Sequence, residues 1–195
     1  MSQCRKAVFL DRDGTINVEK NYLFKIQDFE FLDGAIDALK IIQDKGYRLI
    51  IITNQSGIAR GYYSMDDFDT LTNWMKEYLL NRGVNIDAVY FCPHCPDGLV
   101  KPYNSECNCR KPKLGLFLQA VKDFNLDLSQ CIAIGDKIRD CEICKTTDCK
   151  GFLIGSNERD DIIAEVKKGF YSNIRYANNL LESAKQLSAE FSDRI

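Results

Sequence analysis

The sequence lacks an excess of charge of either sign. Lysine and arginine together number 26, against 28 aspartate and glutamate residues. A chain with this balance has no global positive field that would gather nucleic acid or an anionic membrane surface. We therefore expect no nucleic acid and no membrane among its partners, and a small molecule as its ligand.

Long apolar runs are absent as well. No stretch reaches the roughly 18 consecutive apolar residues that a membrane-spanning helix needs, and residues 1–6 lead into a strand pattern, not into a signal-peptide core. We expect a cytoplasmic protein. The length of 195 residues is near the usual size of one domain, so we predict a single domain over residues 1–195. We also expect a monomer, although no sequence feature specifies the oligomeric state.

Histidine is almost missing, whereas cysteine is abundant for a cytosolic chain. His94 is the only histidine, and the nine cysteines form an odd number that cannot all pair internally. A full disulfide framework is therefore a poor explanation, and metal binding is a better one. Four cysteines lie close to His94 in the sequence: Cys92, Cys95, Cys107 and Cys109.

Short apolar runs alternate along the chain with segments of helical periodicity. The runs are typical of buried strands, at 6–10, 48–53, 88–91, 131–135 and 152–155. The periodic segments predict helices at 34–46, 64–79, 112–124, 139–146 and 180–191. This alternation predicts an α/β fold, a doubly wound Rossmann-like parallel sheet with helices on both faces and a ligand site at the C-terminal ends of the strands.

A few residues predict where helices begin and end. Gly46 is expected to cap the first helix. Ser64, with an aspartate three residues later, is a capping-box-like start, and Pro112 is expected at the first position of its helix. Residues 158–169 are charged enough to predict a mobile surface segment.

Four polar clusters follow predicted strands directly or one loop later. They are Asp11-Arg12-Asp13-Gly14-Thr15, residues 53–57, Arg110-Lys111-Pro112, and residues 135–137 with Asp140. Each cluster alone is ordinarily a solvated turn, a cap or surface charge. Together, at the converging ends of parallel strands, they supply the carboxylates, cations and hydroxyl that phosphoryl transfer through an aspartyl intermediate needs.

A divalent cation is required before these carboxylates can approach an anionic phosphate. Oxygen ligands indicate Mg²⁺. We predict that the side chains of Asp11 and Asp136 and the carbonyl oxygen of Asp13 bind it. The side chain of Asp13 then remains available for proton transfer.

The spacing Cys92-x-His94 followed by Cys107-x-Cys109 predicts a structural zinc site. Three thiolates and one imidazole fill a tetrahedral shell and leave no position for a catalytic water. Zinc would hold the loop 92–109 in one conformation and direct the two cations that follow it, Arg110 and Lys111, toward the substrate. Two alternatives stay open, a four-cysteine site in which Cys95 replaces His94, and a set of free thiols. Three further cysteines are expected to pack against the core and are assigned no function: Cys141, Cys144 and Cys149.

In the order and placement of the four polar clusters, residues 5–155 resemble the haloacid dehalogenase-type phosphatases. The resemblance implies that Asp140 orients the lysine and metal side of the site. It implies five further roles: Asp11 as the nucleophile, Asp13 as the general acid and base, Thr53 as a hydroxyl donor to the phosphoryl oxygens, Lys111 as the neutralising cation and Asp136 as a magnesium ligand.

Longer matches narrow the resemblance to the D-glycero-D-manno-heptose 1,7-bisphosphate 7-phosphatase family of heptose and lipopolysaccharide precursor synthesis. They are FLDRDGTIN, TNQSGIARG, CPHCP, CNCRKP and GDK, although Cys95 departs from the family pattern. The resemblance implies a sugar bisphosphate as substrate. It also implies nine substrate contacts: Glu19, Lys20, Asn21, Tyr22, Asn54, Gln55, Ser56, Arg110 and Lys137.

The related histidinol-phosphate phosphatases share the four motifs and a zinc loop. The twelve residues at 95–106 resemble the longer loop of the heptose family. The gaps 14–46 and 92–109 have no room for the cap domain of many superfamily members, so we expect a site guarded only by short loops. A histidinol-phosphate or other small sugar-phosphate phosphatase and an inactive phosphate-binding module remain alternatives, and the intact Asp11 and Asp13 pair argues against the inactive module.

Overall fold

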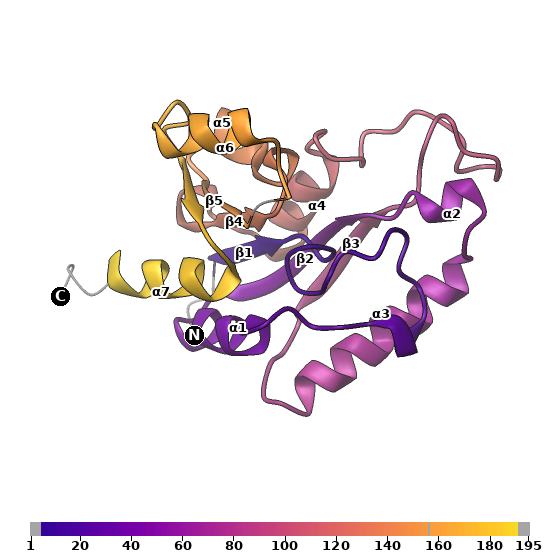
Figure 1. The fold of residues 1–195 in the computed structure, drawn as a ribbon, viewed down its shortest axis with the longest axis horizontal. Helices are drawn as coiled ribbons and strands as arrows, with labels where there is room; N and C mark the ends of the chain where they lie inside the picture. The colour runs from indigo at the N-terminus through magenta and orange to yellow at the C-terminus, as the bar shows by residue number, and fades with distance from the viewer. Residues whose placement is uncertain (1–4, 156, 191–195) are drawn as a thin grey trace.

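Six parallel strands form one sheet in the computed structural model, which describes residues 5–155 and 157–190 (Figure 1). The strand order is β3-β2-β1-β4-β5-β6, with every neighbouring pair parallel. The strands are β1 Ala7–Leu10, β2 Arg48–Asn54, β3 Ala88–Cys92, β4 Ile132–Gly135, β5 Lys150–Ile154 and β6 Ile174–Ala177. The predicted doubly wound α/β sheet is confirmed.

Helices cover both faces of this sheet, and the two sets separate clearly in Figure 1. One face carries α1 Ala35–Asp44, α3 Met65–Leu80 and α7 Leu180–Glu190. The other carries α4 Gly115–Phe124, α5 Ile143–Thr146 and α6 Asp160–Lys167. Four short helices lie in the connections: α2 Gly57–Arg60, and the 3-10 helices η1 Ile26–Asp28, η2 Leu128–Gln130 and η3 Ile138–Cys141.

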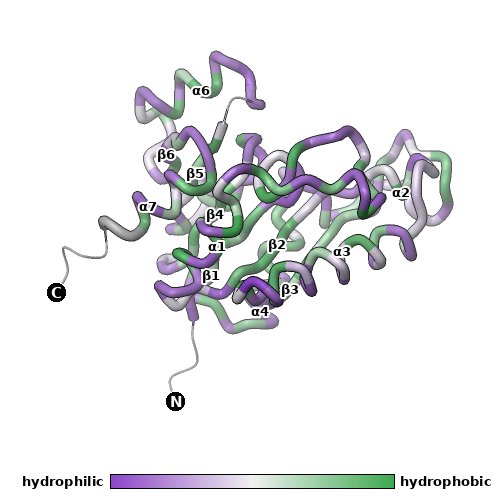
Figure 2. Tube along the Cα trace, turned by 60° about the horizontal axis from the view of Figure 1, so that its bottom comes forward, coloured by the Kyte–Doolittle hydropathy of each residue, from purple (hydrophilic) through white to green (hydrophobic). Residues whose placement is uncertain are grey.

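The core consists of two apolar layers because successive strand residues point to opposite faces of the sheet. In β1, Val8 and Leu10 pack into the layer under α1, whereas Phe9 packs into the layer under α4. There the Phe9 ring meets Phe117 of α4 edge to face, with ring centroids 5.4 Å apart. Figure 2 shows the hydrophobic residues along β2 and the alternating hydropathy along α3. Both faces of the sheet are therefore covered by apolar side chains and shielded from solvent, and polar groups lie at the edges of the sheet.

Two of the predicted helix ends are confirmed. The Ser64 hydroxyl accepts a bond from the Asp67 amide at 3.1 Å, and the Asp67 carboxylate accepts one from the Ser64 amide at 2.8 Å. This capping box starts α3. At the end of α1, Gly46 has a φ of 78°, a left-handed conformation that glycine adopts without a Cβ clash.

The predicted start of one helix is wrong, and several elements were not predicted, whereas the mobility of residues 158–169 stays a prediction. Helix α4 begins at Gly115 and not at Pro112, because residues 110–113 close a turn in which the Lys113 amide donates to the Arg110 carbonyl at 2.9 Å. The charged segment 158–169 contains α6, which buries Ile163 and Val166. Strand β6 and helix α2 were not predicted, and the predicted last residue of the closing helix, Phe191, lies outside the described residues.

The connections at the C-terminal edge of the sheet are short. Between β1 and β2 the structure contains only η1, α1 and two isolated bridges, Asp13 to Asn17 and Asn17 to Phe31. Between β3 and α4 it contains no helix or strand, and all of these residues are described. No separate cap domain is inserted at either place, as predicted. In the described ranges, no helix has the length and apolar character that a membrane crossing requires.

Candidate active site

The C-terminal ends of β1, β2 and β4 meet at one cavity of about 240 Å³. A larger cavity of about 640 Å³ lies at the opposite strand ends, around Lys6, Ile132 and Lys150, and contains none of the predicted site residues. The smaller cavity contains the side chains predicted to react or to bind metal. Its walls bring together every residue predicted to be catalytic or to bind magnesium: Asp11, Asp13, Thr53, Lys111 and Asp136.

Lys111 lies at the bottom of this cavity and is almost completely buried. Its Nζ donates to Asp11 Oδ1 at 2.7 Å and to the Ile52 carbonyl at 2.6 Å, and pairs with Asp140 Oδ1 at 2.7 Å. Burial alone would lower the pKa of Lys111, but the carboxylates of Asp11 and Asp140 more than offset it and raise the pKa. The ammonium therefore stays charged inside the protein, beside the predicted nucleophile.

Three carboxylates lie close together here, and two of them, Asp11 and Asp140, contact that ammonium. One oxygen each from Asp11, Asp136 and Asp140 lies within 4.8 Å of the others, so the cluster could hold a metal ion. Burial, opposed by Lys111 and assisted by the neighbouring carboxylates, raises the pKa of Asp11 to about 7. Burial and the Asp140 charge raise the pKa of Asp136 to about 6. One lysine does not neutralise this cluster, and a bound cation would relieve the remaining repulsion.

Gly14 permits the close approach of two loops at this site. Its φ is +80°, and a Cβ added there would lie 2.4 Å from Asp136 Oδ2. Any side chain at this position would push the Asp136 carboxylate away from the loop that follows β1. The glycine in the first polar cluster is therefore required by the contact with the fourth.

Asp13 is held by donors on several sides. Arg12, which is 1% exposed, reaches both carboxylate oxygens, with Nη2 at 3.0 Å from Oδ1 and 2.9 Å from Oδ2. The Asn17 amide donates to Oδ1 at 3.0 Å, and the Gln55 amide donates to Oδ2 at 3.0 Å. Gln55 also accepts from the Tyr63 hydroxyl. These contacts fix the orientation of the carboxylate at the mouth of the cavity.

Most of the predicted substrate contacts line a second cavity of about 170 Å³, which adjoins the first. They are Glu19, Asn21, Tyr22, Asn54, Gln55, Ser56 and Arg110. The Asn54 amide group also exchanges two bonds with the backbone of Lys111, at 3.1 and 3.0 Å, and so positions the lysine.

Two predicted substrate contacts lie elsewhere. Lys137 lines the first cavity and not the second. Its amide donates to Asp140 Oδ2 at 3.0 Å, which keeps the residue next to the buried cluster. Lys20 lines neither cavity, because its ammonium pairs at 3.0 Å with Glu30 on the surface. The structure thus gives no support to Lys20 as a substrate contact.

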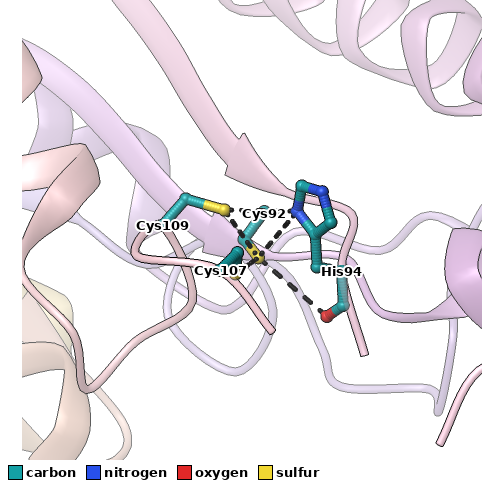
Figure 3. Close-up of side chains that lie close together, drawn as sticks. All are labelled: Cys92, His94, Cys107 and Cys109. Atoms are coloured by element: carbon teal, nitrogen blue, oxygen red, sulfur yellow. Dashed lines mark hydrogen bonds between the residues drawn. The ribbon is translucent and has the colours of Figure 1, made fainter. Parts of the chain in front are cut away.

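The predicted zinc ligands form a second candidate metal centre, which Figure 3 shows with the imidazole and three thiols pointing toward one another. The Cys92 sulfur lies 3.1 Å from that of Cys109 and 3.6 Å from that of Cys107, and His94 Nδ1 lies 3.3 Å from Cys109. Two thiolates on one tetrahedral zinc ion are about 3.8 Å apart, given Zn–S bonds of about 2.3 Å. The spacing of the four groups suits a closed tetrahedral site.

Cys95 is not part of this centre. Its sulfur is buried and accepts a bond from Arg60 Nη2 at 3.3 Å. The four-cysteine alternative, with His94 outside, is therefore not the arrangement that the structure contains. The three other cysteines that were assigned no function are buried against the sheet, as expected: Cys141, Cys144 and Cys149.

The loop that carries the second centre is tied to both sides of the active site. The amides of Leu99 and Val100 donate to the Ala59 carbonyl of α2 at 2.7 and 2.9 Å. Arg110 Nη1 donates to the His94 carbonyl at 3.4 Å. Metal binding at the four ligands would therefore fix the residues that immediately precede Lys111 and the helix that follows β2.

The chain is similar to known proteins over most of its length. A family model described as Polynucleotide kinase 3 phosphatase matches residues 6–180. A Haemophilus ducreyi protein named D-glycero-beta-D-manno-heptose-1,7-bisphosphate 7-phosphatase is 50% identical over 147 residues, 75% of this chain and 80% of that protein. The Escherichia coli K12 protein of the same name is 44% identical over 142 residues, 73% of this chain and 74% of that protein. The chain belongs to the D-glycero-D-manno-heptose 1,7-bisphosphate 7-phosphatase family of haloacid dehalogenase-type phosphatases.

A solved structure agrees with membership of this family. The D,D-heptose 1,7-bisphosphate phosphatase from B. bronchiseptica, described as complexed with magnesium and phosphate, aligns with a TM-score of 0.81 and 28% identity. The alignment covers 95% of this chain and 99% of that one. The fold seen here is therefore that of the family over nearly its whole length.

Several site residues in this family member were not predicted from the sequence. Arg12 and Asn17 contact Asp13, and Asn157 donates to Asp136 Oδ2 at 3.1 Å. Arg139 lines both cavities. The only signal for Arg12 was its position between two aspartates. Arg139 lies within the span of the fourth cluster, and Asn157 lies beyond it. In both places sequence alone does not show which side chains face the site.

Proposed function

We propose that this chain hydrolyses the 7-phosphate of D-glycero-D-manno-heptose 1,7-bisphosphate in the synthesis of heptose precursors for lipopolysaccharide. The observation that carries the proposal is the buried Lys111 ammonium held between Asp11 and Asp140, beside Asp136. This arrangement suits a carboxylate nucleophile with a fixed neutralising cation. The names of the relatives supply the substrate.

The proposed reaction has two displacement steps at phosphorus. Lys111 occupies Asp11 Oδ1, so Oδ2 is the oxygen that attacks. A bond forms between Asp11 and phosphorus as the bond from phosphorus to the sugar oxygen breaks, and Asp13 gives that oxygen its proton. Asp13 then takes a proton from water, which attacks phosphorus and releases phosphate and free Asp11. The Thr53 hydroxyl donates to the phosphoryl oxygens throughout.

Magnesium fits the carboxylate cluster. The crowded carboxylate oxygens and the raised pKa of Asp11 and of Asp136, caused first by burial, are what a hard divalent cation would relieve. The side chains of Asp11 and Asp136 and the carbonyl of Asp13 would hold it. When bound, it supplies the positive charge that lets a phosphate dianion approach the two carboxylates.

Zinc fits the second centre, because three thiols and one imidazole at tetrahedral spacing are its usual structural ligands. Cys92, His94, Cys107 and Cys109 would fill the coordination shell completely. The role we propose for this ion is to hold the loop 92–109. It takes no part in the chemical steps.

Zinc removal should act through that loop. We expect Cys107→Ser to destabilise the protein by about 3 kcal/mol or more, because loss of a structural metal costs more than most substitutions. KM should rise more than kcat falls. Cys95→Ser is the matched control, and should cost about 1 kcal/mol because Cys95 is outside the cluster. Elemental analysis and thermal unfolding of both variants test this. The opposite ranking, or wild-type protein with less than about half an equivalent of zinc, contradicts the assignment.

Arg110→Ala should reduce the preference for a bisphosphate. Arg110 lines the second cavity, where the phosphate that is not cleaved would lie. Loss of a hydrogen bond to a charged group costs roughly 1.5 to 3 kcal/mol, or about ten- to a hundredfold in kcat/KM. A monophosphate without the remote group should lose much less. Equal losses on the two substrates would assign Arg110 to the reacting phosphate or to the loop structure.

A substrate screen tests the proposed function. Phosphate release with Mg²⁺ would be measured for heptose 1,7-bisphosphate, fructose 1,6-bisphosphate and histidinol phosphate. A 3′-phosphorylated oligonucleotide belongs in the set because of the description of the matching family model. We expect the highest kcat/KM with the heptose. A higher value for any of the other substrates would contradict the proposed substrate.

Three expectations from the sequence stay predictions: a single domain over residues 1–195, a monomer and a cytoplasmic location. Sedimentation velocity of the purified chain would test the monomer. Limited proteolysis that released two stable fragments would contradict the single domain.

A further inference from the structure

Arg139 connects the two cavities of the active site. Four residues line both of them: Asp13, Glu19, Asn54 and Arg139. Arg139 is the only cation in this shared set, since Lys111 and Lys137 line the first cavity alone and Arg110 lines the second alone. A molecule that extends from the reacting centre into the second cavity must therefore pass this guanidinium.

The backbone at Arg139 is fixed although its side chain is exposed. Ile138 donates its amide to Glu158 Oε2 at 2.8 Å. The Asp140 amide donates to the Lys137 carbonyl at 2.9 Å, and the Asp140 side chain is buried against Lys111. These bonds fix the backbone of helix η3, so Arg139 lies at a defined position beside the buried Lys111 and its carboxylate partners.

The guanidinium of Arg139 makes no hydrogen bond or ion pair with any residue that the structure describes. Other arginines near the site are engaged, since Arg12 binds Asp13 and Arg110 donates to the His94 carbonyl. Within residues 5–155 and 157–190, nothing therefore competes with a ligand for the five N–H donors of Arg139. A planar guanidinium can bind two phosphate oxygens at once, which a lysine ammonium cannot match in geometry.

The charges of the second cavity suit a second phosphate. Its carboxylates are Asp13 and Glu19, and its cations are Arg110 and Arg139. Lys111 is committed to the reacting phosphate at the bottom of the first cavity. We infer that Arg139 is a specificity-determining residue that, together with Arg110, holds the phosphate that the enzyme does not cleave. This inference rests on the proposed function.

The test compares Arg139→Ala and Arg139→Gln with wild type on heptose 1,7-bisphosphate and on heptose 7-phosphate. The ratio of kcat/KM for the bisphosphate to that for the monophosphate should fall about tenfold or more in both variants. Heptose 1-phosphate, which carries only the remote phosphate, should inhibit each variant with a Ki about tenfold higher. Arg82→Ala, at an exposed arginine that lines neither cavity, should leave the ratio unchanged.

Two outcomes would overturn the inference. One is an unchanged ratio with an unchanged Ki for heptose 1-phosphate. The other is an equal loss on both substrates, which would place Arg139 on the reacting phosphate or in the structure of η3. Failure of the proposed function is a separate result, because it would show in wild type as the absence of any preference for the bisphosphate.

Discussion

Asp11→Asn should abolish turnover and leave the fold intact. An amide cannot form the acyl phosphate, and loss of a group that acts as the nucleophile costs on the order of 10⁴-fold or more in kcat. The fold should survive because asparagine has nearly the same shape, and its carbonyl oxygen can still accept the hydrogen bond from the Lys111 ammonium. Lys111 keeps its pairing with Asp140.

The measurement is phosphate release together with thermal unfolding. Asp69→Asn provides a matched control, because Asp69 is exposed on α3 and lines neither cavity. The control should retain wild-type activity. Activity of Asp11→Asn within tenfold of wild type would remove Asp11 as the nucleophile.

Asp13→Asn should reduce kcat by roughly 10²- to 10⁴-fold, the usual contribution of general acid and base catalysis. An asparagine can keep the contacts with Arg12 through its carbonyl oxygen, so the loss would come from proton transfer and not from collapse of the loop. Both steps should slow, because the same carboxyl group protonates the leaving oxygen and later activates water.

Rapid-quench kinetics separate these two steps. In Asp13→Asn we expect phosphorylation of Asp11 by the substrate to be slower than in wild type. We also expect slower hydrolysis of the phosphorylated enzyme, and so slower release of phosphate. Normal rates of phosphorylation and dephosphorylation in Asp13→Asn would mean that another group is the acid.

The convergence of the polar clusters could be predicted because it follows from topology. Asp11 directly follows β1, Thr53 is the next-to-last residue of β2 and Asp136 directly follows β4, and the ends of parallel strands necessarily share one edge of the sheet. The grouping of Cys92, His94, Cys107 and Cys109 could also be predicted, because paired Cys-x-His and Cys-x-Cys spacings are typical of metal-binding loops.

The contacts that orient these groups depend on distant segments and were not predicted. Arg12 is buried because the Leu23 carbonyl and Gln55 accept bonds from it at 3.2 and 3.4 Å. Asn54 binds the backbone of Lys111 across 57 residues of sequence. Short-range patterns contain no information about such pairs.

The missed elements at the far edge have a different cause. Strand β6 is an edge strand of four residues in which Arg175 is exposed, so it lacks the continuous apolar run of the central strands. In α6 two buried residues, Ile163 and Val166, are spaced three apart among charges. Charged residues dominate α6, and the single exposed Arg175 interrupts the short apolar pattern of β6, so neither segment has a clear periodicity in the sequence.

This chain should remove the phosphate at position 7 of the heptose and retain the one at position 1. Phosphorus NMR of the reaction with D-glycero-β-D-manno-heptose 1,7-bisphosphate and Mg²⁺ tests it most directly. We expect the resonance of the 7-phosphate to be replaced by that of inorganic phosphate in equal amount, while the resonance of the 1-phosphate persists as heptose 1-phosphate. Loss of the 1-phosphate resonance, or a 7-phosphate that survives prolonged incubation, would contradict the account.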